Sequence, residues 1–150
     1  MEYILISFEN IQMWMEIEKE GYALRQIVKD EDDIYHLSCM EDCLAEGVIK
    51  KEDLAGKIIS IKKEEFEEKW NNLKKIYEEK WREIKRNNPI EKKINGKCKY
   101  YYPQGYILDI EGGLGLLKDN STIDVNIGDI VQGIITGYDD INMWLLITLL

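Results

Sequence analysis

The residues whose types could do metal chemistry lie close together, between positions 36 and 46. His36, Cys39 and Cys43 are zinc-ligand types, and cysteines four residues apart on one helix can share an ion. Three carboxylates lie nearby in sequence, at Glu41, Asp42 and Glu46. A structural zinc site needs four ligands, however, and the chain has one histidine and no second closely spaced cysteine pair. Burial of both cysteines is the alternative, because free cysteine is among the most buried residue types, and we predict neither a metal site nor a cofactor.

The inventory for catalysis is equally short. One catalytic triad could be built on the single histidine, but no nucleophile elbow, phosphate-binding glycine loop or zinc-protease motif accompanies it. The 29 acidic side chains are interpreted as solvated surface. We therefore predict that the protein is not an enzyme.

Aromatic and basic side chains of the second half are the ones that could contact nucleic acid. Tyrosine rings stack on bases, and lysine and arginine bind phosphates. The candidate residues are Tyr100, Tyr101, Tyr102, Tyr106 and Lys118, together with Arg82, Lys85, Arg86, Lys92 and Lys93 before them. Packing in and around the sheet is the leading interpretation of the tyrosines, since strands favour aromatic residues whatever their function. Stacking on nucleic-acid bases and contact with a protein are the alternatives.

A long amphipathic helix is predicted over residues 63–86, because its apolar residues recur at gaps of three and four. They are Phe66, Trp70, Leu73, Tyr77, Trp81 and Ile84. Acidic residues fill the first turns and basic residues the last, as the helix dipole favours, and Asn87 to Pro89 end the helix. The stripe is predicted to pack on a core, with a docking groove for a partner as the alternative.

Before this helix, apolar runs and alternating patterns predict a small antiparallel sheet. Its strands are expected at residues 3–8, 14–17, 22–29 and 34–37, and a further strand at 57–61 is expected to lead directly into the long helix. Ser38 and Glu41 have the form of a capping box, and Gly47 is placed to end the short helix that they would begin. Such a helix would put Cys39 and Cys43 on one face.

After the helix, short strands alternate with turn residues. They are expected at residues 96–102, 105–110, 114–117, 129–136 and 142–148, a number that suits a small closed barrel. The sequences that carry a family resemblance are Gly96-Lys97-Cys98, Tyr102 to Ile110, Gly113 to Leu117, Val125 to Val131 and Gly137 to Asp140. Together they resemble the S-one RNA-binding domain, an OB-fold family, over about residues 94–149. Gly105 and Gly115 fall where the barrel of that family bends.

The resemblance implies an OB-fold barrel that binds RNA, and two departures bear on that activity. In the family, aromatic side chains that stack on bases occupy the positions of Gln104 and Ile107, whereas Lys118 matches a position that is often basic. The connection from Asp119 to Asn126 is shorter than is usual in the family. The neighbouring tyrosines are the substitute stacking surfaces, with Tyr100, Tyr102 and Tyr106 as the predicted contacts.

The net charge of −9 disfavours phosphates on average and favours a basic partner. Residues 1–62 and 96–150 are both acidic, and residues 63–95 carry 10 basic against 8 acidic side chains. The chain shows no signal-peptide pattern and no apolar run of about 20 residues, and its three cysteines favour reduced thiols, so a soluble, cytoplasmic protein without a membrane partner is expected.

These patterns predict an α+β protein. Residues 1–88 would form a domain with an antiparallel sheet, a short helix and the long helix, and residues 94–150 a five-stranded OB-like barrel. The leading functional hypothesis is a non-enzymatic binding protein of bacterial type. Its acidic surface would engage a basic protein, as small acidic proteins that neutralise basic toxins do. The alternative is binding of RNA or single-stranded nucleic acid through the barrel, and the oligomeric state stays open.

Overall fold

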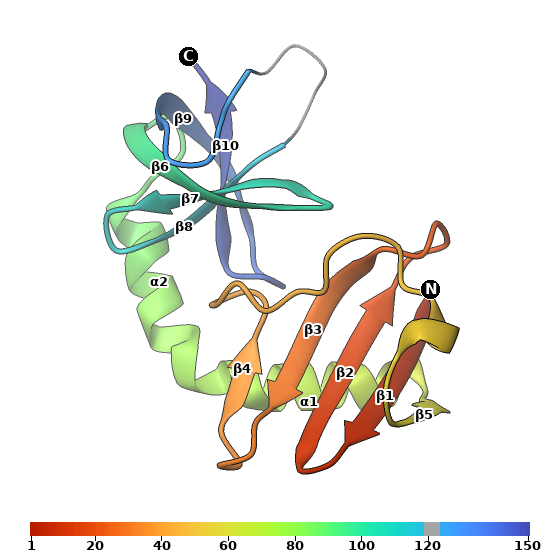
Figure 1. Cartoon of the computed structure of the whole chain (residues 1–150). Helices are drawn as coiled ribbons and strands as arrows, with labels where there is room; N and C mark the ends of the chain where they lie inside the picture. The colour runs from red at the N-terminus through yellow and green to blue at the C-terminus, as the bar shows by residue number, and fades with distance from the viewer. Residues whose placement is uncertain (119–123) are drawn as a thin grey trace. The chain divides into compact units, whose positions relative to one another are not determined.

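The computed structural model describes residues 1–118 and 124–150, and it confirms the α+β class (Figure 1). The chain divides into two compact units, Met1–Ile76 and Tyr77–Leu150. The division falls within the predicted long helix, which consists of α1 (Lys63–Lys74), a 3-10 turn η2 (Lys75–Tyr77) and α2 (Glu78–Asn87). Part of the connection from Asp119 to Asn126 lies outside the described residues.

The first unit contains a five-stranded antiparallel sheet in the order β4-β3-β2-β1-β5. Its strands are β1 (Glu2–Phe8), β2 (Ile11–Ile17), β3 (Ala23–Lys29), β4 (Tyr35–Leu37) and β5 (Lys57–Ser60), followed along the chain by α1. All five predicted strands are confirmed. A 3-10 turn η1 (Lys51–Asp53) precedes β5.

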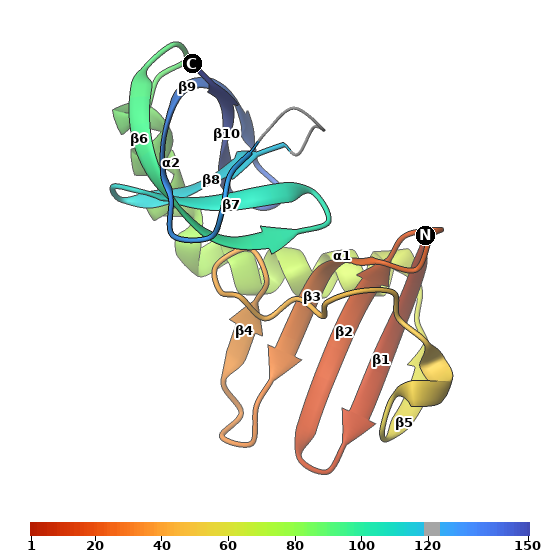
Figure 2. The same ribbon diagram turned by 45° about the horizontal axis from the view of Figure 1, so that its top comes forward.

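Each face of this sheet is covered, so the first unit has three layers (Figure 2). On one face, the fully buried Phe66 and Trp70 of α1 pack over the strands, with the Phe66 ring 5.5 Å from that of Tyr3. On the other face, Ile4 and Met15 belong to an apolar core covered by residues of the segment between β4 and β5. The predicted packing role of the helix stripe therefore holds for these two aromatic residues.

The predicted short helix between Ser38 and Gly47 is wrong. The Ser38 hydroxyl accepts a hydrogen bond from the backbone N–H of Gln26 on β3 instead of capping a helix, at 3.0 Å. The Glu41 carboxylate bonds to the His36 ring at 2.6 Å, and the Gln26 side chain accepts from the Ala45 N–H at 2.7 Å. The two bonds to Gln26 tie the segment to β3, and the segment forms turns and bends, so the capping-box pattern produces no helix.

The second unit is a closed five-stranded, OB-like barrel in the order β10-β8-β7-β6-β9. Its strands are β6 (Lys93–Tyr102), β7 (Gly105–Ile110), β8 (Gly113–Leu117), β9 (Ile130–Asp139) and β10 (Trp144–Leu149). All five predicted strands are confirmed, and β7 matches its predicted bounds. The β8 and β10 pair is parallel, and the other pairs are antiparallel.

The helix α2 is fixed to this barrel near β9. The Trp81 indole N–H donates to the Asp140 carboxylate at 2.8 Å, and the Trp81 ring meets the Tyr138 ring edge-on at 6.2 Å. The Tyr138 hydroxyl donates to the backbone carbonyl of Asn88 at 2.8 Å, where α2 ends. These contacts hold α2 against the end of β9 and the turn that follows it. No helix among the described residues is long and apolar enough to span a membrane.

Gly133 on β9 is expected to be intolerant of a side chain. A Cβ there would lie 2.5 Å from Ile147 Cγ2 and 2.9 Å from the Thr148 carbonyl oxygen on β10. Gly133→Ala should therefore lower the free energy of unfolding by about 1–3 kcal/mol, the usual cost of overpacking. Gly137→Ala is the control, because its Cβ would lie 3.3 Å from Leu146 Cδ1. Urea denaturation measures both variants, and equal losses would contradict the expectation.

Candidate functional site

The basic residues of the second unit are concentrated in one segment. Residues 80–99 carry eight Lys or Arg and two Glu, a net charge of +6. The rest of that unit, residues 77–79 and 100–150, carries one lysine and nine acidic residues. The first unit has a net charge of −7, so most of the acidity of the chain belongs to it. A basic segment within an acidic protein marks a place where an anion can bind.

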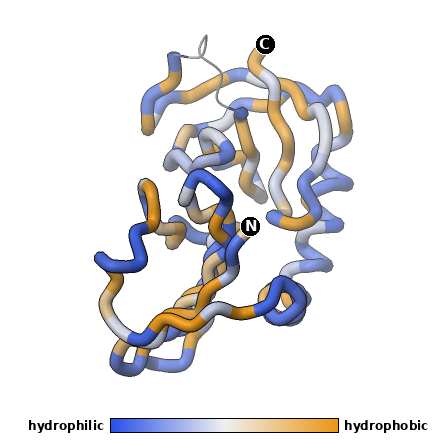
Figure 3. Tube along the Cα trace, turned by 90° about the vertical axis from the view of Figure 1, so that its right-hand side faces the viewer, coloured by the Kyte–Doolittle hydropathy of each residue, from blue (hydrophilic) through white to orange (hydrophobic). Residues whose placement is uncertain are grey.

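Four polar side chains follow one exposed side of β6. Exposed and buried side chains alternate along the first part of this strand. Figure 3 colours the trace of the chain by the hydropathy of each residue. The exposed positions are Lys93, Asn95, Lys97 and Lys99, and the buried ones between them are Ile94, Gly96 and Cys98. We call the four exposed residues the β6 lysine face. From Lys93 to Lys99 it extends about 20 Å, at roughly 3.3 Å per residue.

The lysines of this face are not neutralised by the protein. Within residues 1–118 and 124–150, no salt bridge involves Lys93, Lys97 or Lys99. In the strand register Asn95 lies opposite Gln132 of β9, and Lys97 lies opposite the exposed Ile130. Lys97 also lies opposite Asp109 of β7. Lys93 and Lys99 thus have their charges available to an external anion, whereas Lys97 has the Asp109 carboxylate as its neighbour across the strand pair.

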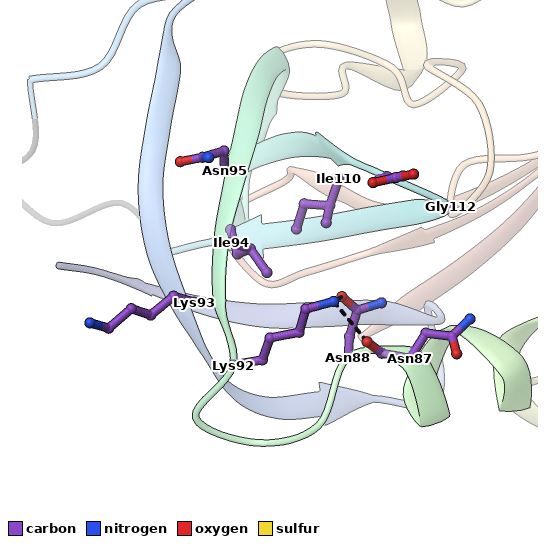
Figure 4. A pocket seen from close by; sticks show the side chains of 9 residues that line it. Asn87, Asn88, Lys92, Lys93, Ile94, Asn95, Ile110 and Gly112 are labelled. Atoms are coloured by element: carbon purple, nitrogen blue, oxygen red, sulfur yellow. Dashed lines mark hydrogen bonds between the residues drawn. The ribbon is translucent and has the colours of Figure 1, made fainter.

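A pocket of about 520 Å³ opens where α2 ends and β6 begins (Figure 4). Lys92, Lys93 and Asn95 line it from the start of β6. The Lys92 ammonium group donates to the Asn87 carbonyl at 2.8 Å and to the Asn88 side-chain oxygen at 3.3 Å. Figure 4 shows Lys93 extending away from these groups. Lys92 therefore caps the end of α2, whereas Lys93 is presented outward.

The wall of this pocket is braced by further hydrogen bonds. The buried Asn88 side chain donates to the Ile84 carbonyl at 2.9 Å. The Glu91 N–H donates to the Ile135 carbonyl at 2.7 Å, and the Ile135 N–H donates to the Lys92 carbonyl at 2.9 Å. These bonds hold the backbone of the site in place before a ligand binds, which reduces the backbone entropy that binding would cost.

The predicted stacking tyrosines differ in their exposure. Tyr102 is 2% exposed, and its ring lies 4.9 Å from that of Tyr100 and 6.1 Å from that of Trp144. Tyr106 lies opposite Tyr101 in the β6–β7 register, with ring centroids 5.0 Å apart. Tyr101 is 50% exposed, which makes it the most accessible ring of this group.

The predicted phosphate-binding residues also differ in their surroundings. Arg82 and Arg86 are exposed on α2, and Lys118 is exposed after β8. Lys85 is engaged by Asp140, at 2.9 Å. Sequence reasoning missed Asn95, Lys97 and Lys99. The alternation of polar and apolar residues from Lys93 onward indicates these exposed positions. The predicted strand begins only at Gly96, so it includes too little of this alternation.

The candidate metal ligands are not brought together. The His36 ring bonds to Asp30 at 2.8 Å and to Glu41 at 2.6 Å. Burial raises the pKa of the Cys39 and Cys43 thiols to about 12, which favours the protonated form over a metal-binding thiolate. Among the described residues, no three His, Cys, Asp or Glu side chains form a group that could hold a metal ion.

The His36 contacts predict a pH-dependent contribution to stability. Hydrogen bonds to Asp30 and then to Glu41 raise the pKa of His36, and the bond to His36 lowers the pKa of Asp30. The stabilisation due to the histidine is complete below its ordinary pKa of about 6.5 and is lost as pH rises through the raised value. Wild type should therefore exceed His36→Gln in stability at mildly acidic pH, and the difference should vanish in alkali. Urea denaturation across this pH range tests it, and a pH-independent difference would contradict it.

The β6 lysine face and the adjoining pocket present ammonium groups, amides and a carboxylate. Ammonium groups attract an anion, and the amides and the carboxylate can form hydrogen bonds with polar groups of the same ligand. No protein-family model matches the chain, and neither the curated proteins nor the solved structures include a significant match.

Proposed function

We propose that the protein is a non-enzymatic binding protein whose barrel holds single-stranded RNA along the β6 lysine face. The observation that carries the proposal is the row of Lys93, Lys97 and Lys99 on one side of a strand, within a segment of net charge +6. Phosphates of an extended strand meet ammonium groups spaced in this way. The resemblance of residues 94–149 to the S-one RNA-binding domain agrees with this ligand.

The proposed surface differs from the one that the family resemblance implies. Ile107 occupies a base-stacking position of the family, and here it is an aliphatic side chain with no exposed area. Gln104 at the other such position is not aromatic. The lysines instead lie on β6, and Tyr101 on the same strand is half exposed. Phosphate binding along β6, with stacking at its Tyr101 end, is therefore the arrangement we propose.

A titration with short single-stranded RNA tests this function. Each phosphate contact on a single strand contributes about −0.7 to the slope of log K against log salt concentration, so the three lysines predict a slope near −2. Fluorescence anisotropy of labelled RNA, measured from low to physiological salt, gives that slope. Absence of binding at low salt, or affinity that is insensitive to salt, would count against the proposal.

The acidic first unit supports a second candidate, the engagement of a basic protein. Its net charge is −7, and Glu31 and Asp32 are exposed at the turn between β3 and β4. Affinity capture from the native host should return a basic protein that the variant with Glu31→Gln and Asp32→Asn retains less well. Equal retention by the variant would exclude this turn as the contact.

A further inference from the structure

The pocket beside the β6 lysine face offers more than charge. Ile94 from β6 and Ile110 from β7 line it but are only 8% and 3% exposed, whereas Asn87 and Asn95 contribute exposed amides. Glu111, in the turn between β7 and β8, adds an exposed carboxylate. A ligand that carried only negative charge would be repelled by this carboxylate and would leave the amides unused.

A nucleotide matches this combination of groups. Its phosphate suits Lys93, and the edge of its base can exchange hydrogen bonds with the asparagine amides. An exocyclic amino group donates well to a carboxylate, as cytosine does to Glu or Asp. A volume of about 520 Å³ leaves room for one such unit. Uracil carries a carbonyl where cytosine carries its amino group, so it would set an acceptor against Glu111.

The pocket is also placed to receive a strand bound on β6. Lys93 and Asn95 belong both to the pocket lining and to the β6 lysine face, so the two surfaces are continuous. We infer that the pocket holds one nucleotide of the bound strand and favours a base with an exocyclic amino group, which Glu111 recognises. This inference rests on the proposed RNA-binding function and adds base preference to it.

Matched oligonucleotides test the inference. Oligocytidylate and oligouridylate of the same length carry the same phosphates, so the β6 lysine face alone would bind them equally. We expect the wild-type protein to bind the cytidine strand at least about fivefold more tightly, a modest value for one charge-assisted hydrogen bond. Glu111→Gln should abolish the difference, because the amide of glutamine can donate to uracil as well as accept from cytosine.

The control is Glu91→Gln, which removes the same charge from the neighbouring loop outside the pocket lining. This variant should bind both strands more tightly and keep the preference for cytidine. Equal binding of the two strands by wild type, or a preference that survives Glu111→Gln, would overturn the pocket inference while leaving RNA binding in place. Failure of both strands to bind at low salt would overturn the proposed function itself.

Discussion

Replacing Arg25 by methionine is expected to lower the free energy of unfolding by about 3–5 kcal/mol, the usual cost of breaking a buried ion pair. Arg25 is 5% exposed, and it donates to Glu16 from Nε at 2.9 Å and from Nη2 at 2.7 Å. It also donates to both carboxylate oxygens of Glu67 on α1, at 2.5 and 3.2 Å. Its guanidinium carbon lies 5.0 Å from the ring centre of Phe66. The arginine thus joins the sheet to α1.

The loss is large because Glu16 would remain buried without its cation. Burial alone would raise the pKa of Glu16, but the hydrogen bonds and charge of Arg25 outweigh burial and hold that pKa below its ordinary value. Burial and the bond to Glu16 also raise the pKa of the Tyr3 hydroxyl to about 12, so Tyr3 stays a donor to the carboxylate. In the variant, the carboxylate keeps the Tyr3 hydroxyl as a hydrogen-bond donor and Lys63 as a neighbouring charge, but it loses the two bonds from Arg25.

Lys69→Met provides the control for this prediction. Lys69 is also a cation of α1 at the sheet, 4.3 Å from the ring centre of Trp14, but it is partly exposed. Its replacement should cost no more than about 1 kcal/mol, as for exposed cation–π contacts. Urea denaturation followed by circular dichroism measures both losses. A loss for Arg25→Met as small as that for Lys69→Met would contradict the assigned role of the arginine.

Reversing the charges of Lys97 and Lys99 is expected to weaken RNA binding at low salt by at least roughly thirtyfold. Each reversal removes an attraction to phosphate and adds a repulsion. Near water, the removal of one contact attraction alone costs about 1 kcal/mol. A combined loss of about 2 kcal/mol or more corresponds to that factor. The fold should persist, because both side chains are exposed and take part in no described salt bridge.

Lys19→Glu with Lys50→Glu is the matched control for this pair. Both lysines are exposed, and both belong to the first unit. The control changes the net charge by the same amount, so its effect measures the general electrostatic contribution. Anisotropy titrations compare the two double variants at one salt concentration. If both lose the same affinity, net charge rather than the β6 lysine face governs binding.

The strands were predictable because their signals are local. Tyr-Pro-Gln-Gly marks the turn before β7, and apolar residues fill the strand to its end at Ile110. The start of β6 was predicted three residues too late, since Lys93 and Asn95 look like loop residues unless the alternation with Ile94 is counted. With the later start, Lys93 and Asn95 of the β6 lysine face fall outside the predicted strand.

Features that depend on distant residues could not be predicted in this way. Ser38 and Glu41 fit the helix-capping pattern. In the folded protein, however, the Ser38 hydroxyl bonds to the Gln26 N–H and the Glu41 carboxylate bonds to the His36 ring. Arg25 reaches Glu67 across 42 positions of the chain, and no local pattern indicates that bond. The pocket likewise combines α2, β6 and the turn after β7, so its volume and lining appear only in three dimensions.

A map of backbone amide chemical shifts on adding single-stranded RNA tests the central claim most directly. We expect the largest shifts on Lys93 to Lys99 of β6 and on the facing residues Ile130 to Ile134 of β9. Shifts confined to the first unit, or to β7 and β8 with β6 unchanged, would contradict it.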